Sequence, residues 1–347
     1  MSKTTIYYFS ATGNSLAVAR HLAKLLDSDE PVSVPGSLIN QDPYIDTRGT
    51  RKLGFVFPVQ RATIPEMLRG FIQSMPIDPT CYYFAVSTYS LFGSNEFWDI
   101  DELLVAEGAA LNFATGVRMM GNVGLVNPSE STITKRLAHM ERQVEEIATA
   151  VAYRQENFFP RANRLLGWAI RTYTDFRRKH IFFTIDKRCK GCGICVQVCP
   201  AQNIQLSRKD SSTVAPIRSD KCEACLACVH WCPAAAVSAS GRVHTSYHNP
   251  LVQPEELQVK SPKASAGAMT GDAVLPTGSA AETSLDEGLA SIPHHELLEA
   301  TDLNTRREAY ERDRTPRHPK EGEYPKGQRE PGMSDAEIVK ALSELER

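Results

Sequence analysis

The first 157 residues alternate between short apolar runs and amphipathic stretches. The apolar runs lie at residues 4–9, 32–34, 53–57, 82–86 and 111–117. Apolar residues with helical spacing follow at residues 16–26 and again near 64–73 and 96–107. Short β-rich runs separated by helices are typical of a parallel sheet with helices on both faces. The pattern therefore predicts an α/β domain over residues 1–157, built on a doubly wound parallel sheet.

Two further helices are predicted after the last of these strands. In the first, apolar residues recur by threes and fours between residues 133 and 151, which gives one buried stripe. The stripe lasts for only about three heptads, so packing against the sheet is favoured over a coiled-coil dimer. Residues 158–181 mix aromatic and aliphatic side chains with arginines and predict a basic amphipathic connector helix. We favour an arm that fastens two domains over a surface for an anionic membrane or an acidic partner.

The pattern changes again after residue 240. Residues 241–347 are rich in Pro, Gly, Ser and mixed charge, and their apolar groups are scattered, which predicts a largely disordered tail. Ser334 and Glu337 form a capping box before apolar residues at helical spacing, so we expect a short helix near 334–346. Such a helix can dock on a partner or on its own domain.

Charge and hydropathy narrow the class of protein. A net charge of −2 argues against a nucleic-acid binder, which needs a basic face. The sequence has no apolar run close to 18 residues and no basic-then-apolar start, so neither a transmembrane segment nor a signal peptide is predicted. We expect a cytoplasmic protein, a compartment in which cysteines remain reduced.

Cysteines supply the most specific signal in the chain. Eight of the nine fall in two copies of the pattern C-x-x-C-x-x-C-x-x-x-C-P. With this spacing, three thiolates of one copy bind one [4Fe-4S] cluster and the fourth reaches the neighbouring cluster. The expected ligands are Cys189, Cys192, Cys195 and Cys232 for cluster one, and Cys222, Cys225, Cys228 and Cys199 for cluster two.

Both cysteine motifs resemble those of the bacterial two-cluster ferredoxins. The resemblance implies a small α+β domain over residues 182–240, with an opening strand at 182–185 and a return strand at 203–206. Two zinc sites or a disulfide framework are the alternatives. Three cysteines at three-residue spacing suit the corner of a cube better than they suit a zinc site. The ninth cysteine, Cys81, is expected to be a small buried hydrophobe.

A polar loop joins the first apolar run to the first helical stretch. It consists of Ser10, Ala11, Thr12, Gly13, Asn14 and Ser15. Backbone N–H groups, hydroxyls and the helix dipole at such a position can bind a phosphate. The loop resembles the S-x-T-G-x-[ST] phosphate loop of the flavodoxins, and the resemblance implies FMN as the ligand. The alternative is an ordinary Ser/Thr-rich turn that caps a helix.

Two more loops should reach the same site, because ligands of doubly wound sheets bind at the carboxyl ends of the strands. The residues concerned are Pro58, Val59 and Gln60 after the third strand, and Ser87, Thr88, Tyr89 and Phe92 after the fourth. Tyr89 and Phe92 are candidates to stack on the flavin ring. Gln60 stands where flavodoxin-like domains commonly place an aromatic residue, and it cannot stack. The acidic residues Glu96, Asp99 and Asp101 are expected at a solvated helix start.

Taken together, residues 3–240 resemble the flavodoxin-ferredoxin fusion family. The resemblance implies an electron-transfer protein in which FMN exchanges electrons with two [4Fe-4S] clusters and a redox partner protein serves as donor or acceptor. The sequence identifies no catalytic residue. Two other functions remain open: a flavin-dependent oxidoreductase that reduces a small molecule with cluster-delivered electrons, and a ferredoxin whose flavodoxin-like domain is only a docking scaffold.

Overall fold

The computed structural model describes ten parts of the chain. They are residues 3–39, 50–60, 63–90, 96–121, 128–159, 172, 183–210, 213–218, 222–239 and 247–257. All of them belong to one compact unit. Nearly all of the predicted connector helix at 158–181, and the whole of the predicted helix at 334–346, lie outside these residues. None of the described helices is both long enough and apolar enough to cross a membrane.

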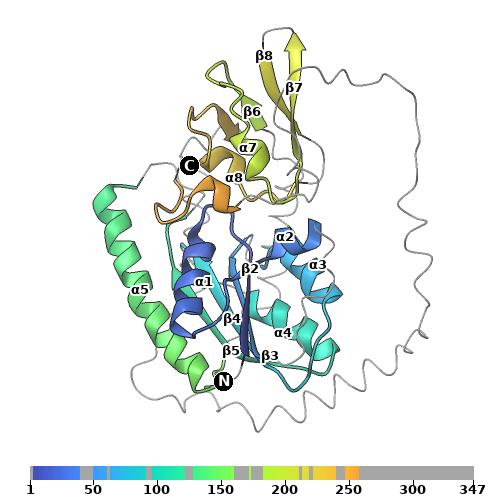
Figure 1. Ribbon diagram of the computed structural model, residues 1–347, viewed down its shortest axis with the longest axis vertical. Coiled ribbons are helices and arrows are strands. Elements are labelled where there is room, and N and C mark those ends of the chain that lie inside the picture. Colours follow the sequence, from blue (N-terminus) through green and yellow to red (C-terminus); the bar gives the residue numbers. More distant parts are fainter. Residues whose placement is uncertain are drawn as a thin grey trace, which may run out of the picture. The chain divides into compact units, whose positions relative to one another are not determined.

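A five-stranded parallel sheet forms the first domain, as predicted (Figure 1). Its order is β2-β1-β3-β4-β5, which is the flavodoxin-like order. The strands are β1 (Lys3–Tyr8), β2 (Val32–Ser33), β3 (Thr50–Pro58), β4 (Tyr82–Tyr89) and β5 (Leu111–Arg118). Because all five strands are parallel, the loops that follow them meet at one edge of the sheet.

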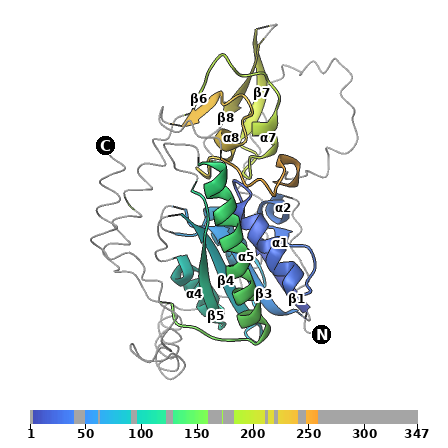
Figure 2. The ribbon, with the colours of Figure 1, turned by 90° about the vertical axis from the view of Figure 1, so that its left-hand side faces the viewer.

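Helices cover both faces of this sheet. Figure 2 shows α1 (Asn14–Leu25) and α5 (Glu130–Ala152) side by side on one face. The other face carries α2 (Val34–Ile39), α3 (Glu66–Ser74) and α4 (Glu96–Ala106). α5 begins at a Ser129 N-cap, whose hydroxyl accepts a hydrogen bond from the Thr132 N–H. Its buried stripe lies against the sheet and α1, which confirms the predicted packing.

The two central strands are buried on both faces. Phe55 and Phe57 of β3 and Phe84 of β4 are all 0% exposed. Gly54 leaves room for the Phe84 ring, since a Cβ atom at residue 54 would lie 2.1 Å from Phe84 Cζ. Cys81 is buried just before β4, and burial raises the pKa of its thiol to about 11. It is thus the small buried hydrophobe that the sequence predicts.

The acidic residues of α4 differ from their prediction. Glu96, Asp99 and Asp101 are 2%, 5% and 1% exposed, whereas the sequence analysis expects a solvated helix start. Their carboxylates accept hydrogen bonds inside the domain, as Asp101 does from the Leu111 N–H (3.0 Å). Asp99 also lies 3.4 Å from the Arg69 guanidinium. Hydrogen bonds and ion pairs with these partners offset the cost of burying the carboxylates. The partners belong to other elements, so the spacing of residues in the sequence does not reveal them.

The second domain, residues 183–239, holds both cysteine motifs. Its elements are β6 (Phe183–Ile185), α7 (Ile194–Gln197), β7 (Ile204–Asp210), β8 (Thr213–Arg218), α8 (Ala227–His230) and β9 (Val237–Ala239). β6 pairs with β9, and β7 pairs with β8, both antiparallel. The expected return strand at 203–206 therefore does not pair with the opening strand. It forms a hairpin with the strand that precedes the second motif, because a short connection favours that pairing.

A further segment, residues 247–257, packs on the first domain. We call it the strap; it ends in the short 3₁₀ helix η1 (Pro254–Leu257). Tyr247, Asn249 and Val252 of the strap are 5%, 0% and 1% exposed. From the sequence, this segment is expected to belong to a disordered tail that begins at residue 241. Its few apolar residues suffice for packing because the first domain supplies the complementary surface.

Candidate functional site

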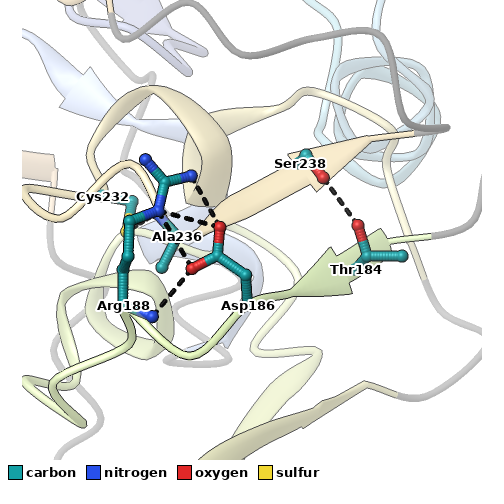
Figure 3. A network of polar contacts seen from close by, with 6 residues as sticks. All are labelled: Thr184, Asp186, Arg188, Cys232, Ala236 and Ser238. Carbon is teal, nitrogen blue, oxygen red and sulfur yellow. Dashed lines mark hydrogen bonds and ion pairs between the residues drawn. The ribbon is translucent and has the colours of Figure 1, made fainter.

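Pairing of β6 with β9 brings together three cysteines of the first motif and the last cysteine of the second. β6 leads into the first motif and β9 follows the second, so their pairing puts the start of one motif beside the end of the other. Figure 3 shows this junction, where the Asp186 N–H donates to the Ala236 carbonyl (3.0 Å) and the Ala236 N–H donates to Cys232 Sγ (3.3 Å). Cys189, Cys192, Cys195 and Cys232 line one cavity. These are the four that the spacing groups as cluster one.

Side chains support the same junction. The hydroxyls of Thr184 on β6 and Ser238 on β9 lie 2.6 Å apart, and the Arg188 guanidinium forms an ion pair with Asp186 (2.6 Å) (Figure 3). The side chains of Arg188 and Asp186 are about half exposed, so this ion pair adds little stability. Its main effect is to order the turn that enters the first motif, because the Arg188 N–H also donates to Asp186 (2.8 Å).

The β7–β8 hairpin brings the other four cysteines together. It connects the end of the first motif to the start of the second, with Ile204 paired to Arg218 at its base. Cys199, Cys222, Cys225 and Cys228 all line a second cavity. The grouping again equals the one that the spacing predicts for cluster two. The two antiparallel pairings thus bring together the same two sets of four cysteines that crossed ligation requires.

The sulfurs receive hydrogen bonds from the backbone. Asn203 N–H donates to Cys199 Sγ and Ala224 N–H donates to Cys222 Sγ, each at 3.2 Å. Such bonds stabilise thiolates and tune cluster potential. Burial, together with the Cys192, Cys232 and Cys189 thiols beside it, raises the pKa of Cys195 to about 11. Crowded thiols of this kind need a bound cation to remain deprotonated, and a four-iron cube supplies one.

Each of the two cavities is lined by four cysteines. In the described part of the chain, no three thiol, imidazole or carboxylate groups come close enough together to hold one metal ion. Each set of four cysteines instead surrounds a space. Four thiols around one cavity equal the four protein ligands that a [4Fe-4S] cluster needs.

A separate pocket lies at the carboxyl edge of the sheet. Its lining comes from four loops and consists of Ser10, Ala11, Thr12, Asn14, Ser15, Pro58, Val59, Thr88, Tyr89, Ser90, Met119, Met120 and Gly121. The pocket thus unites the three loops that the sequence predicts. About 50 Å³ of it is open to water, which corresponds to a few water molecules. That space suits a phosphate group rather than a whole flavin.

The phosphate loop has the features of an anion site. Gly13 adopts a left-handed conformation (φ 89°) as the N-cap of α1 and provides no side-chain cap. The first N–H groups of α1 therefore face the loop without a capping side chain, and its first turn has no acidic residue. Ser10 lines the pocket and is 9% exposed, and its hydroxyl has no hydrogen-bond partner among the residues that the structure describes. A buried hydroxyl without a partner fits a ligand that supplies an acceptor.

The other predicted flavin contacts differ in whether they line this pocket. The hydroxyls of Ser15 and Thr88 lie 2.8 Å apart and tie the phosphate loop to β4. Gln60 is buried, and within the described part of the chain both polar atoms of its side chain are without a hydrogen-bond partner, but it does not line the pocket. Ser87 is also buried and outside the lining; its hydroxyl lies 3.3 Å from the Glu96 carboxylate. Phe92 lies outside the described residues.

Sequence reasoning did not find the loop that follows β5. Met119, Met120 and Gly121 line the pocket, and the Met120 carbonyl accepts a hydrogen bond from the Asn14 amide (2.9 Å). The signal was available, because β5 is parallel to β4 and its carboxyl end must reach the same edge. Ser90, one residue beyond β4, lines the pocket beside Tyr89 and belongs to the loop that the sequence predicts there.

The pocket and the cysteine motifs are in direct contact through the second motif. The indole N–H of Trp231, the residue before Cys232, donates to the Ala11 carbonyl in the phosphate loop (2.9 Å). The Glu223 carboxylate, next to Cys222, accepts the Glu66 N–H at the start of α3 (2.8 Å). No local sequence pattern predicts either contact, because each joins residues more than 150 positions apart.

Residues 188–236 match the family model described as a 4Fe-4S dicluster domain. The match covers both cysteine motifs, and a domain of this family binds two [4Fe-4S] clusters through eight cysteines. The chain therefore joins a flavodoxin-like domain to a 4Fe-4S dicluster domain, a combination that indicates a role in redox chemistry. No curated protein matches the chain.

Several solved structures resemble the first domain. One is an FMN-dependent NADH-azoreductase from Bacillus anthracis str. Ames Ancestor in complex with FMN, at 14% identity over 44% of this chain and 100% of that chain, with a TM-score of 0.30. Another is a flavodoxin from Streptococcus pneumoniae TIGR4, at 16% identity over 43% of this chain and 99% of that chain, with a TM-score of 0.28. Both likenesses are weak, and the flavodoxin-like fold is identified by the strand order.

Proposed function

We propose that this chain is an electron-transfer protein that passes electrons between FMN, bound at the phosphate loop, and two [4Fe-4S] clusters. The observation that carries the proposal is the hydrogen bond from Trp231 to Ala11, because it links the residue beside a cluster ligand to the flavin pocket. FMN would supply the ability to exchange electrons singly or in pairs, and the clusters exchange them one at a time. A redox partner protein would then donate or accept the electrons.

The residues of the pocket have separate tasks in this proposal. Ser10 and Thr12 offer hydroxyls to the phosphate, and the start of α1 offers backbone N–H groups. Tyr89 lines the pocket at the end of β4, where it is the candidate to contact the ring. Gln60 remains a candidate for the ring edge, since its amide can donate and accept a hydrogen bond.

In this proposal, the eight cysteines bind the two clusters. We assign Cys189, Cys192, Cys195 and Cys232 to cluster one and the other four to cluster two, which the two cavities support. Val198 and Cys225 belong to the same hydrophobic cluster as the core of the flavodoxin-like domain. A continuous core of this kind favours electron transfer within the chain over a mere docking scaffold.

Ser10→Ala tests whether the loop binds the phosphate of FMN. Removal of a buried hydroxyl without a partner should leave the stability of the flavin-free protein unchanged or raise it by about 1 kcal/mol. FMN affinity should fall by about 1–3 kcal/mol, or roughly 5- to 150-fold, because the phosphate loses a donor. Binding can be measured by quenching of flavin fluorescence, together with chemical unfolding of the same preparations.

Riboflavin is the matched control because it lacks only the phosphate. Its affinity should be the same for wild type and Ser10→Ala. Equal affinity of the wild type for FMN and riboflavin would contradict the proposal, and the loop would then be only a helix cap.

A further inference from the structure

The outer side of the phosphate loop is held by residues that follow the second cysteine motif. The Trp231 indole N–H donates to the Ala11 carbonyl at 2.9 Å, and the backbone N–H of Asn249 in the strap donates to the Thr12 carbonyl at 2.8 Å. Trp231 is 5% exposed and Asn249 is 0% exposed, so both hydrogen bonds are shielded from water. Two successive carbonyl groups of the loop are thus fixed from outside the flavodoxin-like domain.

Fixing a carbonyl also fixes the N–H group of the same peptide. The peptide is planar and trans, and the described chain has no cis bond, so the C=O and N–H groups point in opposite directions. The N–H groups of Thr12 and Gly13 must therefore point away from Trp231 and Asn249. Neither of them donates to a backbone carbonyl in the described part of the chain. Both remain available to an anion in the pocket that Thr12 lines.

Asn14 ties the same loop to the strap. Its side-chain carbonyl accepts hydrogen bonds from the Tyr247 hydroxyl (2.9 Å) and the Asn249 amide (3.1 Å). The strap is in turn anchored by the ion pair of Glu256 with Arg20 on α1 (2.6 Å). The Asn14 side chain, which also lines the pocket, thus links the phosphate loop to the strap.

We propose that Trp231 and the strap are positioning elements for the flavin phosphate loop, so that FMN affinity depends on a cluster domain folded around its clusters. The inference rests on the proposed function. Trp231 directly precedes Cys232, the ligand that the second motif contributes to cluster one, and small cluster domains fold with their metal. Coupling between binding sites is reciprocal, so bound FMN should also protect the clusters.

Trp231→Phe tests this inference in the full-length protein loaded with clusters. Phenylalanine keeps an aromatic ring, which can retain the stacking on His248 (ring centroids 4.2 Å apart), but it lacks the N–H donor. FMN affinity should fall about tenfold while riboflavin affinity and iron content stay at the wild-type values. Tyr247→Phe removes only the hydroxyl bonded to Asn14 and should lower FMN affinity by about threefold.

Tyr82→Phe is the matched control. It removes a hydroxyl that donates to the Gln155 carbonyl at the amino end of β4, the end opposite to the pocket. This variant should keep the wild-type ratio of FMN to riboflavin affinity. A second readout is the loss of iron to a chelator, which bound FMN should slow in wild type but much less in Trp231→Phe.

The outcomes separate the inference from the proposed function. A wild type that prefers FMN, with an unchanged preference in both Trp231→Phe and Tyr247→Phe, overturns the inference alone. A wild type that binds FMN and riboflavin equally overturns the proposed flavin site, and the inference with it. A lowered FMN preference in Trp231→Phe, with the control unchanged, supports both.

Discussion

Cys199→Ala should reduce the iron content of the anaerobically purified protein from about eight to about four atoms per chain, because one of two four-iron clusters is lost. We expect the lost cluster to be cluster two, although the nearest cysteine in sequence, Cys195, belongs to cluster one. The physical reason is the β7–β8 hairpin, which places Cys199 beside Cys222, Cys225 and Cys228. Iron and sulfide analysis with electron paramagnetic resonance of the reduced protein measures the result.

Comparison with other cysteine variants identifies which cluster remains. The spectrum of Cys199→Ala should match that of Cys222→Ala, and the spectrum of Cys232→Ala should match that of Cys192→Ala. Cys81→Ala is the control, because this thiol is buried beside β4 and lines neither cluster cavity. A spectrum of Cys199→Ala that matches Cys192→Ala would contradict the crossed assignment.

Gly13→Ala should lower the free energy of unfolding by about 2–4 kcal/mol and abolish the preference for FMN over riboflavin. Gly13 has a φ of 89°, a conformation that costs an L-residue about 1–2 kcal/mol. A Cβ atom at this position would also lie 2.9 Å from Val252 Cβ and 3.1 Å from Asn249 Cβ in the strap. Relief of the contact must move either the strap or the loop, and both hold the N–H groups of the phosphate site.

Gly70→Ala provides the control for this prediction. Gly70 lies in α3, and a Cβ atom there meets nothing within 4 Å. Alanine should raise the free energy of unfolding by about 0.5–1 kcal/mol at this position and leave FMN binding unchanged. Equal effects of the two substitutions on stability would show that neither the left-handed conformation nor the strap constrains Gly13.

The sequence predicts the architecture well because its signals are periodic and local. Apolar runs at residues 53–57 and 82–86 fall within β3 and β4, and the helix predicted from residues 133–151 falls within α5. The cysteine spacing groups the same four residues that line each cluster cavity. A motif with fixed spacing constrains geometry directly, so these predictions needed no knowledge of long-range contacts.

The sequence fails where a residue is partnered by an element distant in the chain. The strap resembles the polar tail that follows it, and only the surface of the first domain shows why Tyr247 and Val252 become buried. The acidic side chains of α4 were expected in solvent because their partners, such as the Leu111 N–H, come from other elements. The strand predicted at 203–206 as the return strand of 182–185 pairs with β8 instead, a partner that lies beyond the first motif.

The central claim is that electrons pass between the flavin and the clusters within one chain. The most direct test reduces the flavin by a light flash in anaerobic protein that contains about eight irons and one FMN per chain, and follows flavin and cluster absorbance together. We predict that the clusters become reduced at the rate at which the flavin is reoxidised, and that this rate is independent of protein concentration. A rate proportional to protein concentration, or unchanged clusters after the flash, would contradict the account.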